Sequence, residues 1–120
     1  MEALLDWLPR VGAVLQLIIG LVGFFKPRAF TEQLQIAMNS PMAVSEVRTV
    51  FGGLNLGVAL AALLMNAPLV YMALGSAWFF GLLARFYSMA VDRASFKESA
   101  PGIAVDAVLS FLYLSGLFFS

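Results

Sequence analysis

The chain has 120 residues, of which 62% are hydrophobic and 12% charged, and its formal net charge is zero. An average soluble domain contains roughly 25% charged residues, so this composition is typical of an integral membrane protein. The chain has no cysteine and no histidine, which excludes disulfides, thiolate chemistry, histidine general bases and most transition-metal sites. The balanced charge argues against nucleic acid as a partner, and we expect no metal and no cofactor.

The first apolar segment, residues 7–25, predicts a transmembrane helix. Its uncharged core, Val11 to Phe25, extends about 22 Å as a helix, which is shorter than the ~30 Å hydrocarbon layer. We therefore expect Arg10 to reach the interface beside Trp7. A cleaved signal peptide is the alternative, but acidic residues precede the segment and no small-residue cleavage site follows it.

A polar connection precedes the second span. Lys26-Pro27-Arg28 ends the first helix, and residues 30–38 then place apolar side chains at helical spacing. This pattern predicts a short helix in the membrane interface, either an ordinary connector packed on the bundle or a sensor of lipid or of a partner. Ser40 and Pro41 resemble an N-cap followed by proline at the first helical position, which predicts a second span over residues 41–65.

Two further spans complete the predicted fold. Asn66-Ala67-Pro68 interrupts an uncharged run that is too long for one helix, so we expect a helical hairpin with a third span over residues 68–91. A second polar loop follows, and Ser99-Ala100-Pro101 begins a fourth span over about residues 100–119. The sequence thus predicts an all-α protein, one integral membrane domain of residues 1–120. We expect a four-transmembrane-helix bundle with a short interfacial helix between its first and second helices.

The basic residues predict the orientation of the bundle. Six lie on one side, namely Lys26, Arg28, Arg48, Arg85, Arg93 and Lys97, and Arg10 alone lies on the other. Because cytoplasmic loops are enriched in lysine and arginine, the side with six is expected in the cytoplasm and both termini outside it.

Four charged residues flank or interrupt the apolar segments, and they are the main candidates for a site: Glu46, Arg48, Arg85 and Asp106. Arg85 lies near the end of the third span and Asp106 near the start of the fourth, so both are about 8 Å below the same surface. Glu46 and Arg48 fall near the same level of the second span. They are two residues apart and cannot face each other on a helix, so their partners are expected on other helices.

We expect Asp106 to pair with Arg85 or with Arg48. Asn55 and Ser110 are further candidate members of this polar cluster, and Asn55 is alternatively interpreted as a hydrogen bond between two helices. The cluster is interpreted either as a structural lock between helices or as a binding or proton-linked site.

Small residues form two stripes at four-residue spacing, a pattern that favours close helix packing inside the bundle or against a partner helix. The stripes are Gly53, Gly57 and Ala61 in the second span, and Ala73, Ala77 and Gly81 in the third.

Two segments resemble a known family. The segments are SEVRTVFGGLNLGVAL (Ser45 to Leu60) and GLLARFYSMAVD (Gly81 to Asp92), and an acidic residue follows early in the last helix. Together they resemble the DUF4345 family of small four-helix bacterial membrane proteins, a domain of unknown function. The resemblance covers nearly the whole chain and implies the fold, the polar cluster and the bacterial inner membrane, but no activity. This chain has Arg93 and Asp106 where the family pattern often has glycine and glutamate. The segment VRTVFGG is also distantly similar to Erg28-like scaffold proteins, which implies a non-catalytic role.

Two functions are consistent with these patterns. Minimal loops favour an accessory, scaffold or assembly subunit that packs, within membrane lipid, against another membrane protein or against its own copies. The alternative is a small transporter or lipid-like-ligand binder that uses the buried charges. We do not expect an enzyme, because carboxylates and arginines can move protons but no nucleophile or cofactor motif accompanies them.

Overall fold

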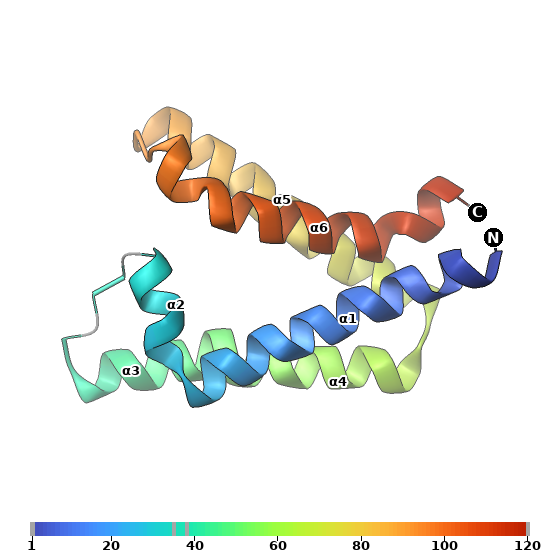
Figure 1. Ribbon diagram of the computed structural model, residues 1–120, viewed down its shortest axis with the longest axis horizontal. Coiled ribbons are helices and arrows are strands. Elements are labelled where there is room, and N and C mark those ends of the chain that lie inside the picture. Colours follow the sequence, from blue (N-terminus) through green and yellow to red (C-terminus); the bar gives the residue numbers. More distant parts are fainter. Residues whose placement is uncertain (1, 35, 38, 120) are drawn as a thin grey trace. The chain divides into compact units, whose positions relative to one another are not determined.

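All regular secondary structure is helical in the part of the chain that the structure describes, residues 2–34, 36–37 and 39–119. In this computed structural model the helices are α1 (Glu2–Phe25), α2 (Pro27–Leu34), α3 (Pro41–Val47), the π-helix η1 (Arg48–Leu54), α4 (Asn55–Met65), α5 (Pro68–Val91) and α6 (Phe96–Phe119) (Figure 1). The predicted all-α class is confirmed.

Three stretches are long and apolar enough to cross a membrane. They are Trp7–Phe25, Pro41–Met65 and Pro68–Val91, with mean hydropathies of 1.9, 1.7 and 1.5. The second stretch is made of α3, η1 and α4 placed end to end. These are the segments for which the sequence predicts the first three spans. The predicted fourth span falls within α6, which is not one of the three.

The chain divides into two compact units, which are described separately. One unit is Ala13–Met65, and the other is Met1–Gly12 together with Asn66–Ser120. The predicted membrane domain over residues 1–120 stays a prediction.

A proline separates the first two helices. Pro27 cannot donate the backbone hydrogen bond that would continue α1, but its fixed φ suits the first position of a new helix, so α2 begins there. The short helix therefore starts earlier than the predicted segment 30–38 and ends at Leu34. Residues 35 and 38 of that segment lie outside the described residues.

The second span begins as its sequence predicts and then changes helix type. The Ser40 hydroxyl accepts a hydrogen bond from the backbone N–H of Ala43 at 3.1 Å, and Pro41 follows at the start of α3. The π-helix η1 then replaces α-helix over Arg48–Leu54, which was not predicted from the sequence. A π-helical turn holds an extra residue and shifts the faces of the next helix.

Two polar loops connect the helices of the second half. Asn66, between α4 and α5, has a φ of 44°, a left-handed conformation that asparagine adopts more readily than most residues. Its side-chain oxygen accepts hydrogen bonds from the Tyr71 hydroxyl at 2.8 Å and from Arg10 Nε at 3.1 Å. The Arg10 guanidinium lies 4.6 Å from the centre of the Trp7 ring. These contacts hold the Asn66 side chain at the start of α5, within the unit that contains α5 and residues 1–12.

The last helix begins earlier than predicted. The Ser95 hydroxyl accepts a hydrogen bond from the backbone N–H of Glu98 at 3.0 Å, and α6 starts at Phe96. Ser99-Ala100-Pro101 is therefore inside the helix, with Pro101 within its early part. Because proline lacks an N–H donor, it is tolerated best near a helix start.

In the unit that contains α5 and α6, these two helices run side by side in opposite directions (Figure 1). Tyr71 of α5 stacks on Tyr113 of α6 with ring centres 6.0 Å apart. A Cβ at Gly75 would meet side-chain atoms of Leu114 at 2.5 and 2.7 Å, so the glycine makes room for a large side chain. This packing brings the polar residues of the two helices together.

In the other unit, α1 crosses the second span at glycines. A Cβ at Gly20 would lie 2.6 Å from the Leu56 backbone nitrogen, and one at Gly23 would lie 2.8 Å from the Phe51 carbonyl. A Cβ at Gly52 would likewise overlap backbone atoms of Phe24. Only residues without a side chain allow two helix backbones to approach in this way.

Candidate functional site

An ion pair joins α5 to α6. Arg85 Nε donates to Asp106 Oδ2, and the two charges neutralise each other between the helices. The Asp106 carboxylate is almost fully buried at 5% exposure, whereas the Arg85 side chain remains 34% exposed. Of the two partners expected for Asp106, the structure therefore shows Arg85. The sequence brings them together because α5 and α6 are antiparallel neighbours and both residues lie near the connecting loop.

A glycine makes room for this pair. A Cβ at Gly102 would overlap the carbon and both terminal nitrogens of the Arg85 guanidinium. Gly102 lies one helical turn before Asp106, so both face the same side of α6. This glycine was not predicted from the sequence. Its four-residue spacing from the predicted acidic residue was the signal that could have identified it.

Ser110 lies one turn beyond Asp106 and is buried. Its hydroxyl donates to the backbone carbonyl of Ala107 at 3.0 Å, a bond within its own helix. The serine therefore extends the polar side of α6 next to the ion pair, but its proton is directed to the backbone and not to Asp106.

Glu46 and Arg48 belong to the unit formed by residues 13–65. Arg48 Nη1 donates to the carbonyl oxygen of Phe24, near the end of α1, where the helix leaves carbonyls without an intrahelical partner. Glu46 is exposed and forms no ion pair with another described residue. Arg48 is thus bound within its own unit, Glu46 has no ion-pair partner among the described residues, and the ion pair shown among the four charged candidates joins Arg85 to Asp106.

Asn55 joins two helices of its own unit. Its side-chain oxygen accepts a hydrogen bond from Gln16 Nε2 at 3.0 Å, and its amide nitrogen donates to the Phe51 carbonyl at 3.0 Å. A polar amide inside apolar helices must be satisfied by protein groups, and Gln16 on α1 provides that partner. The structure thus shows a hydrogen bond between α1 and α4, which is one of the two interpretations of Asn55, and its membership of the Asp106 cluster stays a prediction.

The two small-residue stripes do not pack inside their own units. A Cβ built at Gly53, Gly57 or Gly81 meets no described atom of its own unit within 4 Å. The alanines of the stripes are all exposed, namely Ala61, Ala73 and Ala77. The close approaches occur at Gly20, Gly23, Gly52 and Gly75 instead. Four-residue spacing finds a small-residue face, but which face meets a neighbour depends on the arrangement of helices.

The described residues offer no metal centre, since no three acidic side chains among them gather closely enough to hold an ion. The ion pair itself can tie helices together or bind a charged group through the exposed part of Arg85.

Comparison with known proteins identifies the family. A family model described as a domain of unknown function, DUF4345, matches residues 4–117. The chain belongs to the DUF4345 family. No curated protein and no solved structure matches the chain significantly. Membership in DUF4345 carries no assigned activity, so the function has to be argued from the side chains themselves.

Proposed function

We propose that the chain is a four-span membrane protein that serves as an accessory or assembly subunit and contacts another transmembrane helix through Gly53, Gly57 and Ala61. The observation that supports this role most directly is the open space above the two glycines, where an added Cβ meets no described atom of the same unit within 4 Å. Small residues let helix backbones approach closely in a membrane. A partner helix, from another membrane protein or from a second copy, fits that face.

The fourth span of this proposal is α6, a helix of 24 residues from Phe96 to Phe119. Its buried Asp106 would be costly in lipid as a lone charge. Pairing with Arg85 neutralises the carboxylate against α5, and this supports membrane insertion of the two helices as a hairpin. The distribution of basic residues supports a location with both termini outside the cytoplasm, in a bacterial inner membrane.

A non-catalytic role is consistent with the chemistry of the pair. Arg85 and Asp106 satisfy each other, and no group of acidic residues in the described part could hold a catalytic metal. Acid–base catalysis requires a group positioned against a reacting atom, usually with a nucleophile or an electrophile beside it. The proposed role of the pair is to hold α5 against α6.

The test introduces a large side chain into the face formed by Gly53, Gly57 and Ala61. Gly57→Leu should weaken association by about 5- to 150-fold, because overpacking a close helix contact costs roughly 1–3 kcal/mol. Ala90→Leu is the matched control, since Ala90 is exposed on α5 and belongs to neither stripe. Association between differently labelled copies in liposomes, and the mass of the complex purified in a mild detergent, measure self-association and partner binding. Equal association of both variants would contradict the assembly role.

A small transporter or ligand binder is the second candidate. It is favoured by the 34% exposure of Arg85, which leaves guanidinium donors accessible next to a buried carboxylate. Purified protein reconstituted alone in liposomes provides the test. Movement of a substrate that Asp106→Asn abolishes, without loss of folded protein, would replace the assembly role with transport.

A further inference from the structure

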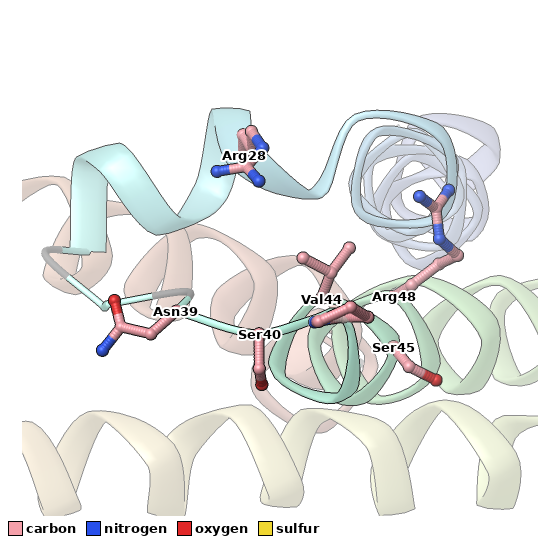
Figure 2. Close-up of a pocket in the computed structure, with 7 residues that line it drawn as sticks. Arg28, Asn39, Ser40, Val44, Ser45 and Arg48 are labelled. Carbon is pink, nitrogen blue, oxygen red and sulfur yellow. The ribbon is translucent and has the colours of Figure 1, made fainter.

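A polar cavity lies outside the ion pair, at the start of the second span. It has a volume of about 570 Å³ and lies between α2 and the beginning of α3 and η1. Its lining residues are Arg28, Asn39, Ser40, Pro41, Val44, Ser45 and Arg48. Figure 2 shows Arg28 on α2 and Arg48 on the helix after α3, with Asn39 and Ser40 on the connecting segment. The cavity is thus built by elements of a single compact unit.

The charges of the lining are all positive. Two arginines contribute guanidinium groups, and none of the described lining residues is acidic. Glu32 lies one turn after Arg28 on α2, but it is exposed and forms no ion pair with a described residue. The Arg28 side chain is exposed and makes no hydrogen bond to a described residue. The positive charges of Arg28 and Arg48 are therefore not neutralised by a described acidic side chain, and they can attract an anion into the cavity.

Arg48 is held in place for such a role. Its Nη1 is bound to the Phe24 carbonyl at the end of α1, which fixes the guanidinium at the edge of the cavity. An arginine offers five N–H donors in a planar fork, so the other donors of Arg48 remain available. Arginine pairs bind phosphate through such forks more specifically than single point charges. The serine hydroxyls of Ser40 and Ser45 add neutral donors to the same lining.

The cavity also lies at one end of a candidate membrane span. Pro41 begins a stretch long and apolar enough to cross the membrane, and the lining residues lie before Pro41 and within the first turns after it. Headgroup phosphates lie just outside the hydrocarbon core at that level. The volume is much larger than a bare phosphate ion requires, and it has room for the glycerol to which a lipid phosphate is attached.

We propose that the cavity between α2 and α3 binds a phosphate group through Arg28 and Arg48. A lipid headgroup and a free phosphate ion share this chemistry. The site is separate from the assembly face at Gly53, Gly57 and Ala61, and its test does not depend on that role.

The experiment titrates the purified full chain, in a neutral detergent, with short-chain phosphatidic acid and follows binding by calorimetry. Dioctanoylglycerol, which lacks the phosphate, is the control for binding through the lipid chains. A titration with inorganic phosphate tests whether the site binds a free ion. Arg28→Gln is the main variant, because Arg48→Gln would also remove the hydrogen bond to Phe24. Lys26→Gln is the matched control, since Lys26 is exposed nearby and does not line the cavity.

We expect about one phosphatidic acid per chain and binding weaker by about tenfold in Arg28→Gln, the effect of losing a charge-assisted contact. Lys26→Gln should change affinity by less than about twofold, because a remote exposed charge contributes little. Binding of inorganic phosphate with the same dependence on Arg28 would identify a free ion as the ligand of the site. Absence of saturable binding by either phosphate probe, equal losses in the two variants, or equal binding of dioctanoylglycerol would each overturn the proposal.

Discussion

At the residue scale, polar side chains within the apolar helices have protein partners. Asp106 is bound by Arg85, Gln16 by Asn55, and the Ser115 hydroxyl by the Leu112 carbonyl at 2.8 Å. Among the described residues, no buried side-chain nitrogen or oxygen lacks a hydrogen bond. Lipid offers no hydrogen bonds in place of water, so the two pairs that join different helices, Arg85 with Asp106 and Gln16 with Asn55, also determine which helices are neighbours within each unit.

The ion pair should behave as a unit. Asp106→Asn and Arg85→Gln should each destabilise the protein, because each leaves the other group without its charge partner. Breaking a fully buried pair costs roughly 3–5 kcal/mol, and the 34% exposure of Arg85 should reduce that figure. The double variant should recover part of the loss. Thermal unfolding in detergent measures all three proteins, and additive losses would show that the two residues do not depend on each other.

Gly102 allows a sharper test of the same pair. Gly102→Ala should displace the guanidinium and weaken its bond to Asp106, since the new Cβ would occupy the position of that group. In an Arg85→Gln background the obstacle is gone, and the alanine should stabilise α6 by about 0.5–1 kcal/mol through its better helix propensity. Unfolding free energies of the four proteins measure this change of sign.

Gly81→Ala provides the control for that cycle. An added Cβ there meets no described atom of its own unit within 4 Å, so the alanine should have the same small effect in both backgrounds. A loss on Gly102→Ala that persists without Arg85 would show that the glycine serves helix packing and not the ion pair.

At the element scale, glycines decide how α1 meets the second span. Gly23 on α1 lies against Gly52 and Gly20 lies one turn along against Leu56, whereas a Cβ at Gly53 or Gly57 meets no described atom of the same unit within 4 Å. The stripe prediction assumed regular α-helical spacing, but η1 covers Arg48–Leu54 and ends between those two glycines. One extra residue in a helix rotates the later turns by about 100°. A sequence pattern alone does not reveal where a π-helix occurs, so it could not identify the contacting face.

The crossing predicts opposite effects for two glycines. Gly20→Ala should destabilise the protein by roughly 1–3 kcal/mol, because a Cβ 2.6 Å from the Leu56 backbone nitrogen forces the helices apart. Gly57→Ala should be neutral or stabilising by up to about 1 kcal/mol, because its Cβ enters open space and alanine favours helix. Denaturant unfolding in detergent micelles distinguishes them, and similar effects of both changes would mean that α1 does not cross at Gly20.

At the scale of the whole molecule, the apolar pattern was sufficient to place the three candidate membrane spans, but not η1 or the starts of α2 and α6. The break at Asn66 and the Ser40 cap were readable because each depends on a few adjacent residues. Arg85 and Asp106 were predictable as partners because neighbouring antiparallel helices fix their depth. The cavity lined by Arg28 could not be predicted, because its residues come from α2, from the connecting segment and from the start of the second span, and these meet only through the packing of α2. For Asn55 the sequence predicts a hydrogen bond between helices as one interpretation, but it does not identify Gln16 as the partner.

The orientation of the chain is a property of the whole molecule and yields the last prediction. Six of seven basic residues lie on one side of the proposed spans, so that side should remain in the cytoplasm. Alkaline phosphatase fused after Ser120 should be active, because the enzyme folds only outside the cytoplasm, and a fusion after Arg93 should be inactive. A fluorescent protein that matures in the cytoplasm should give the reverse result. Activity of the Ser120 fusion only in the cytoplasm would invert the topology. If the fusions after Arg93 and after Ser120 both report the same side of the membrane, α6 does not cross it.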